Sequence, residues 1–75
     1  MPVLERFAQS RVVMSTGDHP PAHVHVQLRD GRDCRIDLHS LTVEGTVAPR
    51  EIREERLWIA SNRERLRAQW RRLNP

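Results

Sequence analysis

Residues 23–39, HVHVQLRDGRDCRIDLH, decide the fold of this chain. Apolar and polar side chains alternate in two runs, 23–29 and 34–39, as is typical of strands with one buried face. The Asp30-Gly31 pair between the runs is a strong turn signal. Together these features predict a β-hairpin whose apolar face packs into a core.

The pairing within this hairpin follows from its apolar face, because residues directly opposite one another point to the same side of a sheet. A two-residue loop would mix the apolar and polar faces, which one-sided burial forbids. A three-residue loop over 30–32 keeps the faces apart. With that loop, His25 lies opposite Asp37 and His23 lies opposite His39. We therefore expect the histidines to gather on the polar face beside a carboxylate.

Shorter strands are expected before the hairpin, at residues 2–7 and 11–15. A loop rich in glycine, aspartate and proline, 15–21, leads from them into the hairpin. Residues 41–47 show no regular pattern and contain Gly45 as a break. The sequence therefore predicts a three- or four-stranded antiparallel sheet in β-meander order.

A C-terminal helix is expected to start at Pro49, because proline suits the first turn of a helix. An apolar stripe with a seven-residue repeat marks its buried side, and the stripe comprises Ile52, Ile59, Leu66 and Leu73, with Trp70 beside it. A straight helix of this length would span about 37 Å, whereas the strands are roughly 20 Å long. Either the helix is continuous and a partner covers the overhang, or it breaks near Ser61, where Glu64 completes a possible capping box.

The 75 residues are enough for one domain, so the predicted fold class is α+β in a single domain, 1–75. The antiparallel sheet occupies 1–47 and one long or kinked helix occupies 48–74. The single cysteine, Cys34, excludes an intrachain disulfide and is read as a buried side chain. The sequence contains neither a signal peptide nor an apolar run long enough to cross a membrane, which favours a cytoplasmic location.

The histidines are the first candidates for chemistry, since four occur in the chain. Histidines two residues apart on a strand share a face and can ligate zinc or a similar divalent metal, so the metal candidates are His19, His23 and His25. An imidazole beside a carboxylate also suits acid–base catalysis, for which the candidates are His23, His25, His39 and Asp37. Solvated side chains on an exposed sheet face are the alternative.

The arginines are the second candidates. All 13 basic residues are arginine, the net charge is +3, and five arginines crowd residues 63–72. This helix end can bind phosphate, or it can simply be a solvated end that complements the helix dipole. The candidates for binding nucleic acid or a partner are Arg63, Arg67 and Arg71, with Leu57, Trp58 and Trp70 as apolar contacts.

The segment 19–26, HPPAHVHV, resembles the signature of a family of small bacterial domains of unknown function. The likeness extends to 1–4, to 48–52 at the helix entry, and to 62–70 at the helix end, so it covers almost the whole chain. Ala48 stands where that family has serine as the helix N-cap, a change that costs about 1 kcal/mol.

The resemblance implies a role in a toxin–antitoxin-like gene pair, because members are typically encoded beside another small domain. It implies that the chain binds a small partner protein. A second copy of the chain, RNA and DNA are further candidate partners, and binding to a membrane is not expected. Our expectation is a binding module of such a pair. A small ribonuclease that uses the histidines, or a histidine-based metal-binding domain, is the alternative.

Overall fold

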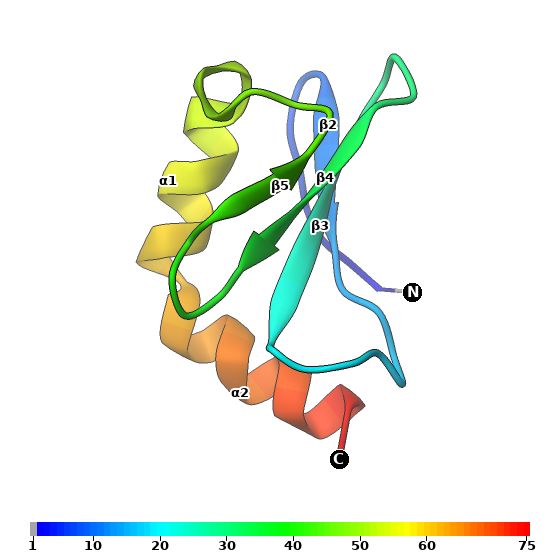
Figure 1. The fold of residues 1–75 in the computed structure, drawn as a ribbon, viewed down its shortest axis with the longest axis vertical. Coiled ribbons are helices and arrows are strands. Elements are labelled where there is room, and N and C mark those ends of the chain that lie inside the picture. The colour runs from blue at the N-terminus through cyan, green and yellow to red at the C-terminus, as the bar shows by residue number, and fades with distance from the viewer. Residues whose placement is uncertain (1) are drawn as a thin grey trace.

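A computed structural model describes residues 2–75, and in it the chain forms a five-stranded antiparallel sheet followed by helices. Figure 1 shows how the helices lie beside the sheet. The strands lie in the sheet in chain order, which confirms the β-meander and the α+β class. Their bounds are β1 (Val3–Arg6), β2 (Ser10–Val13), β3 (His23–Leu28), β4 (Asp33–Asp37) and β5 (Val43–Gly45).

The number of strands differs from the expected three or four because β5 forms in the segment that shows no regular pattern. β5 has only three residues and ends at Gly45, the residue read as a break. Gly45 has a φ of +135°, and a Cβ at this position would lie 2.8 Å from the backbone oxygen of Asp33. The glycine therefore allows β5 to approach β4 closely.

The β3–β4 hairpin keeps the predicted faces, but its register is shifted by two residues. The N–H of Leu28 donates to the carbonyl of Arg32 at 2.8 Å, so the three-residue loop is 29–31 rather than 30–32. The reason is Gly31, whose φ of +97° suits the last position of such a loop.

This register changes the partners of the histidines. His25 pairs with Arg35, and His23 pairs with Asp37. The expected pairs of His25 with Asp37 and of His23 with His39 are therefore wrong. His39 lies beyond the end of β4, in the turn that follows it.

The C-terminal helix is kinked, which agrees with one of the two predicted forms. A 3₁₀ turn, Pro49–Ile52, leads into α1 (Arg53–Ser61), and Asn62 separates α1 from α2 (Arg63–Leu73). The side-chain amide of Asn62 donates to the carbonyl of Trp58 at 2.8 Å, and α2 has no side-chain N-cap, so the expected Ser61 capping box does not form. The kink makes the molecule shorter than a straight helix of about 37 Å would require, because its longest dimension is 32 Å.

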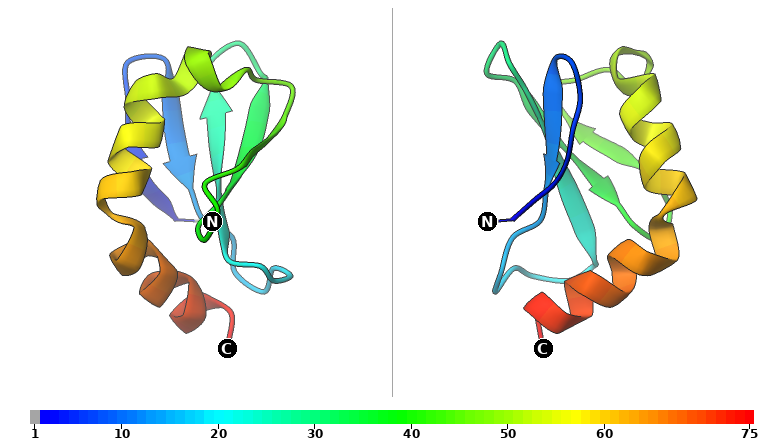
Figure 2. Two further views of the ribbon diagram at one scale, coloured as in Figure 1. Left: turned by 60° about the vertical axis from the view of Figure 1, so that its left-hand side comes forward. Right: turned by 180° about the vertical axis from the view of Figure 1, so that it is seen from behind.

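Both helices lie on the same side of the sheet, as the two views of Figure 2 show. The predicted stripe faces the sheet, where Ile52, Ile59 and Leu66 are fully buried. They pack against buried side chains of the strands, which include Val12, Val24, Val26, Cys34 and Ile36. Burial raises the pKa of the Cys34 thiol, in keeping with a packed side chain. Among residues 2–75, no helix covers the opposite face of the sheet.

A buried polar contact joins the helices to the sheet. The hydroxyl of Ser10 in β2 donates to the carboxylate of Glu55 in α1, and both residues are buried. Within residues 2–75, none of the helices combines the length and the apolar character that a membrane crossing requires.

Candidate functional site

His23 and His25 lie next to each other on the face of β3 that points away from the core. Their alternation with Val24 and Val26 places both imidazoles on one side, with ring centroids 5.1 Å apart. His23 begins β3 at the end of the sheet that α2 reaches, and its ring lies 6.3 Å from that of Trp70. The helix thus shields His23, whereas His25 faces the open side.

The ring of His23 is held in one orientation. Its side chain is only 4% exposed, and its Nδ1 lies 2.8 Å from the carbonyl oxygen of Pro21. A carbonyl can only accept a hydrogen bond, so Nδ1 carries the proton and donates it. Nε2 is thereby directed at the neighbouring carboxylate of Asp18, 2.9 Å away.

Asp18 comes from the loop between β2 and β3 and completes a group of three. Its Oδ2 lies 2.9 Å from Nε2 of His23 and 3.8 Å from Nε2 of His25. Its Oδ1 accepts a hydrogen bond from the backbone N–H of His19 at 2.8 Å. That hydrogen bond, helped by the nearby His23 ring, lowers the pKa of the Asp18 carboxyl below its usual value, so Asp18 is ionised.

The end of α2 fixes the loop that carries Asp18. The backbone N–H of Asp18 donates to the side-chain oxygen of Asn74, and the amide group of Asn74 donates to the carbonyls of Ser15 at 3.2 Å and Trp70 at 3.0 Å. The N–H of Gly17 also reaches the carbonyl of Leu73. The position of the carboxylate therefore depends on contacts between residues more than 50 positions apart.

This arrangement can hold a metal ion. One ligand atom from each of Asp18, His23 and His25 can be chosen so that all three lie within 4.8 Å of one another. Ligands at about 2.1 Å from a tetrahedral zinc lie about 3.4 Å apart, and the distances of 2.9 and 3.8 Å bracket that value. Because Nδ1 of His23 carries the ring proton, Nε2 of His23 and Oδ2 of Asp18 are both hydrogen-bond acceptors. Two acceptors this close require a proton or a metal cation between them.

The predicted metal ligands are therefore brought together in part. His23 and His25 belong to the group, whereas His19 is exposed and contributes its backbone N–H to Asp18. Asp18, which the sequence predicts only as part of a loop, takes the third position. Its signal was its place directly before the histidine motif, but the contact with Asn74 that positions it has no local signature.

The two further catalytic candidates are not part of this group: Asp37 is the cross-strand partner of His23, but among residues 2–75 neither Asp37 nor His39 makes a side-chain hydrogen bond or ion pair with the group. The carboxylate of Asp37 accepts hydrogen bonds from the backbone N–H groups of His39 and Ser40 at 2.7 and 2.9 Å. The N–H of Ser40, followed by that of His39, lowers the pKa of Asp37. Asp37 thus closes the turn after β4, and His39 is exposed on that turn.

The candidate arginines of the helix end make local contacts. Arg63 donates to the carbonyl of His39 at 3.2 Å, and Arg67 lies 3.4 Å from Glu64. Arg71 is exposed. No contact among residues 2–75 gathers the three into one site.

The apolar candidates differ in exposure. Trp70 is 7% exposed and belongs to the core, so its ring is unavailable to a partner. Trp58 is half-buried and packs edge-on against Phe7, with the guanidinium of Arg65 over its ring at 5.9 Å. Leu57 in α1 is 63% exposed, so its side chain is accessible.

Comparison with known proteins gives a family for the chain. Residues 10–71 match the model of a family described as a domain of unknown function, DUF4160, and this range contains Asp18, His23 and His25. Neither a curated protein nor a solved structure matched the chain. Because the match covers most of the sequence, the chain belongs to the DUF4160 family.

Proposed function

We propose that this domain binds a divalent transition-metal ion, zinc first, through Nε2 of His23, Nε2 of His25 and the carboxylate of Asp18. The observation that carries the proposal is the 2.9 Å approach of His23 Nε2 to Asp18 Oδ2, with the Nδ1 proton already engaged by Pro21. A hydrogen bond from the second ring nitrogen to a carbonyl is the usual support of a metal-bound histidine.

The ligand set favours zinc over harder cations. Imidazole nitrogens suit zinc, iron and nickel, whereas magnesium and calcium prefer oxygen ligands throughout. Three protein ligands leave the fourth tetrahedral position to water, as in catalytic zinc sites, where the metal makes that water a nucleophile near neutral pH. The side chain of His25 is 27% exposed, so solvent reaches this side of the group. The reaction class that fits is metal-assisted hydrolysis.

Zinc titration of the purified, tag-free protein by calorimetry tests this proposal. One site per chain is expected, and Asp18→Asn, His23→Gln and His25→Gln should each lower the affinity by more than about 100-fold, since even supporting residues are worth about 10- to 100-fold. The exposed histidines provide matched controls, because His19→Gln and His39→Gln remove the same kind of side chain outside the group. They should leave the affinity unchanged.

Thermal unfolding gives a second readout. Zinc at 100 times its dissociation constant stabilises a folded protein by about 2.7 kcal/mol, which raises the melting temperature of a domain of this size by about 10–20 °C. No shift, or an equal shift in the His23→Gln variant, would contradict the site. Cleavage of RNA that persists in EDTA and is lost in His25→Gln would instead support the metal-free ribonuclease.

We also propose that the domain acts as one half of a toxin–antitoxin-like pair and binds a small partner protein through the outer side of α1. The exposure of Leu57, which is 63%, supports this surface because a large apolar side chain is left in contact with solvent. Leu57 lines a pocket of about 180 Å³ together with Leu41, Ala60, Arg53 and Arg56. A surface that combines apolar and cationic side chains suits a partner that carries acidic residues.

Expression of this chain alone and together with its gene neighbour tests the pairing. Growth arrest by one component and rescue by the other are expected. Leu57→Glu should abolish both co-purification and rescue, whereas Thr46→Glu, on an exposed residue outside that pocket, should abolish neither. Normal co-purification of the Leu57→Glu protein would exclude this surface.

A further inference from the structure

A row of polar side chains crosses the open face of the sheet, two residues along β3 from His25. Arg6 in β1 pairs with Arg11 in β2, Arg11 pairs with Gln27 in β3, and Gln27 pairs with Asp33 in β4. Residues paired in this way point to the same side of the sheet. Gln27 alternates with the core residue Val26, so this side faces away from the helices.

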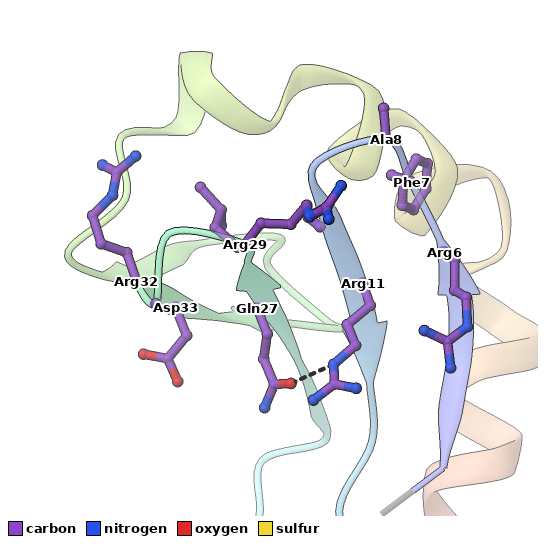
Figure 3. Close-up of a pocket in the computed structure, with 11 residues that line it drawn as sticks. Arg6, Phe7, Ala8, Arg11, Gln27, Arg29, Arg32 and Asp33 are labelled. Atoms are coloured by element: carbon purple, nitrogen blue, oxygen red, sulfur yellow. Dashed lines mark hydrogen bonds between the residues drawn. The ribbon is translucent and has the colours of Figure 1, made fainter.

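The four side chains of this row line a pocket of about 590 Å³. Two hairpin turns border it, one with Phe7 and Ala8 and the other with Arg29 and Arg32, as Figure 3 shows. Its volume lies within the range of about 300–1,000 Å³ that is typical of ligand sites. We call this pocket and its arginine rim the basic groove.

Three arginines of the basic groove have no acidic partner. Arg32 is paired with both Asp30 and Glu51, at 2.9 Å each. Arg11 donates only to the neutral amide oxygen of Gln27, at 2.8 Å. Among residues 2–75, no ion pair joins Arg6, Arg11 or Arg29 to a carboxylate, although all three are exposed. The groove therefore presents uncompensated guanidinium groups to solvent.

We propose that the basic groove binds the phosphate backbone of a single-stranded nucleic acid. Guanidinium groups bind phosphate oxygens in a bidentate manner, and a positively charged groove along the backbone is how proteins hold single strands without reading their sequence. Charge complementarity supports this occupant, because three free cations face one carboxylate, that of Asp33, at the far end of the row. The arginines of α2 are not needed for this contact.

The groove also suggests a substrate class for the metal site, a step that rests on the proposed function. His25 and Gln27 lie two residues apart on the same side of β3, about 7 Å at the usual rise of a strand. A single-stranded nucleic acid held by Arg6 and Arg11 thus passes near the group formed by Asp18, His23 and His25. The substrate class for hydrolysis is then a phosphodiester.

Fluorescence anisotropy with short labelled RNA and DNA strands of one sequence tests the groove. The double variant Arg6→Gln/Arg11→Gln should lower the affinity on the order of 10- to 30-fold at about 0.1 M salt and make the logarithmic salt dependence shallower by about 1.4, the value for two phosphate contacts. Arg71→Gln/Arg72→Gln removes the same charge from α2 and should have little effect. Asp33→Asn should strengthen binding.

RNA and DNA should bind alike, because the contact is to phosphate, and binding should persist in EDTA. Equal losses in the two arginine double variants, or no binding by the parent protein, would overturn the groove. So would equally tight binding of a polyglutamate peptide, which would assign the groove to an acidic protein. If the protein binds the nucleic acid in EDTA but takes up no zinc, the metal site is refuted and the basic groove is not. The two proposals can therefore fail separately.

Discussion

The contact between Asn74 and the Asp18 loop offers the sharpest test of how this fold builds its site. Asn74→Ala removes two hydrogen bonds that cross from the end of α2 to the loop, one with the N–H of Asp18 and one with the carbonyl of Ser15. At about 0.5–1.5 kcal/mol each, their loss lowers the free energy of unfolding by about 1–3 kcal/mol. The same loss frees the carboxylate, so zinc affinity should fall about 10- to 100-fold.

Asn62→Ala is the matched control, because Asn62 also donates its amide to a carbonyl of the helical region, that of Trp58 at 2.8 Å. Both variants should unfold at lower urea concentration, as followed by tryptophan fluorescence. Only Asn74→Ala should also weaken zinc binding measured by calorimetry. If the two variants bind zinc equally well, Asn74 stabilises the helix end but does not position Asp18.

Three further predictions concern the fold. Ser10→Ala should lower the free energy of unfolding by about 1–3 kcal/mol, because it removes the buried hydrogen bond to Glu55, and in a double-mutant cycle with Glu55→Leu the two losses should be far from additive. Gly45→Ala should destabilise the β4–β5 pair, detected as faster amide exchange in β5, since the added Cβ meets the backbone of Asp33. Asp37→Asn should lower the free energy of unfolding at neutral pH, because the pKa of Asp37 is lowered in the folded protein and its carboxylate therefore stabilises the fold. In urea titrations, the difference in free energy between variant and parent should shrink as the pH falls below about 3.9, where the carboxylate becomes protonated.

The strands and the helix stripe could be predicted because each follows a local pattern. Alternation through Val24 and Val26, and the seven-residue repeat through Ile59 and Leu66, identified the buried faces correctly. The hairpin loop was misplaced by one residue because Asp30-Gly31 was taken to start it, whereas the positive φ of Gly31 requires glycine at its end. A shift of two residues in register keeps the faces and changes every facing pair.

The candidate site could be predicted only for its histidines. His23 and His25 are two residues apart on one strand, so their proximity follows from strand geometry alone. Asp18 comes from a loop whose path is set by Asn74, 56 positions away, and no local pattern reports such a contact. His39 was included through the wrong register, which shows how one misplaced loop residue alters a predicted site.

The most direct test of the central claim is long-range ¹H–¹⁵N NMR of the histidine rings before and after zinc is added. His23 should be protonated at Nδ1, and zinc should shift the Nε2 signals of His23 and His25 together while those of His19 and His39 stay unchanged. The same spectrum of Asp18→Asn should respond only at much higher zinc concentration. Zinc shifts at His19 or His39, or none at His23, would contradict a metal site built from Asp18, His23 and His25.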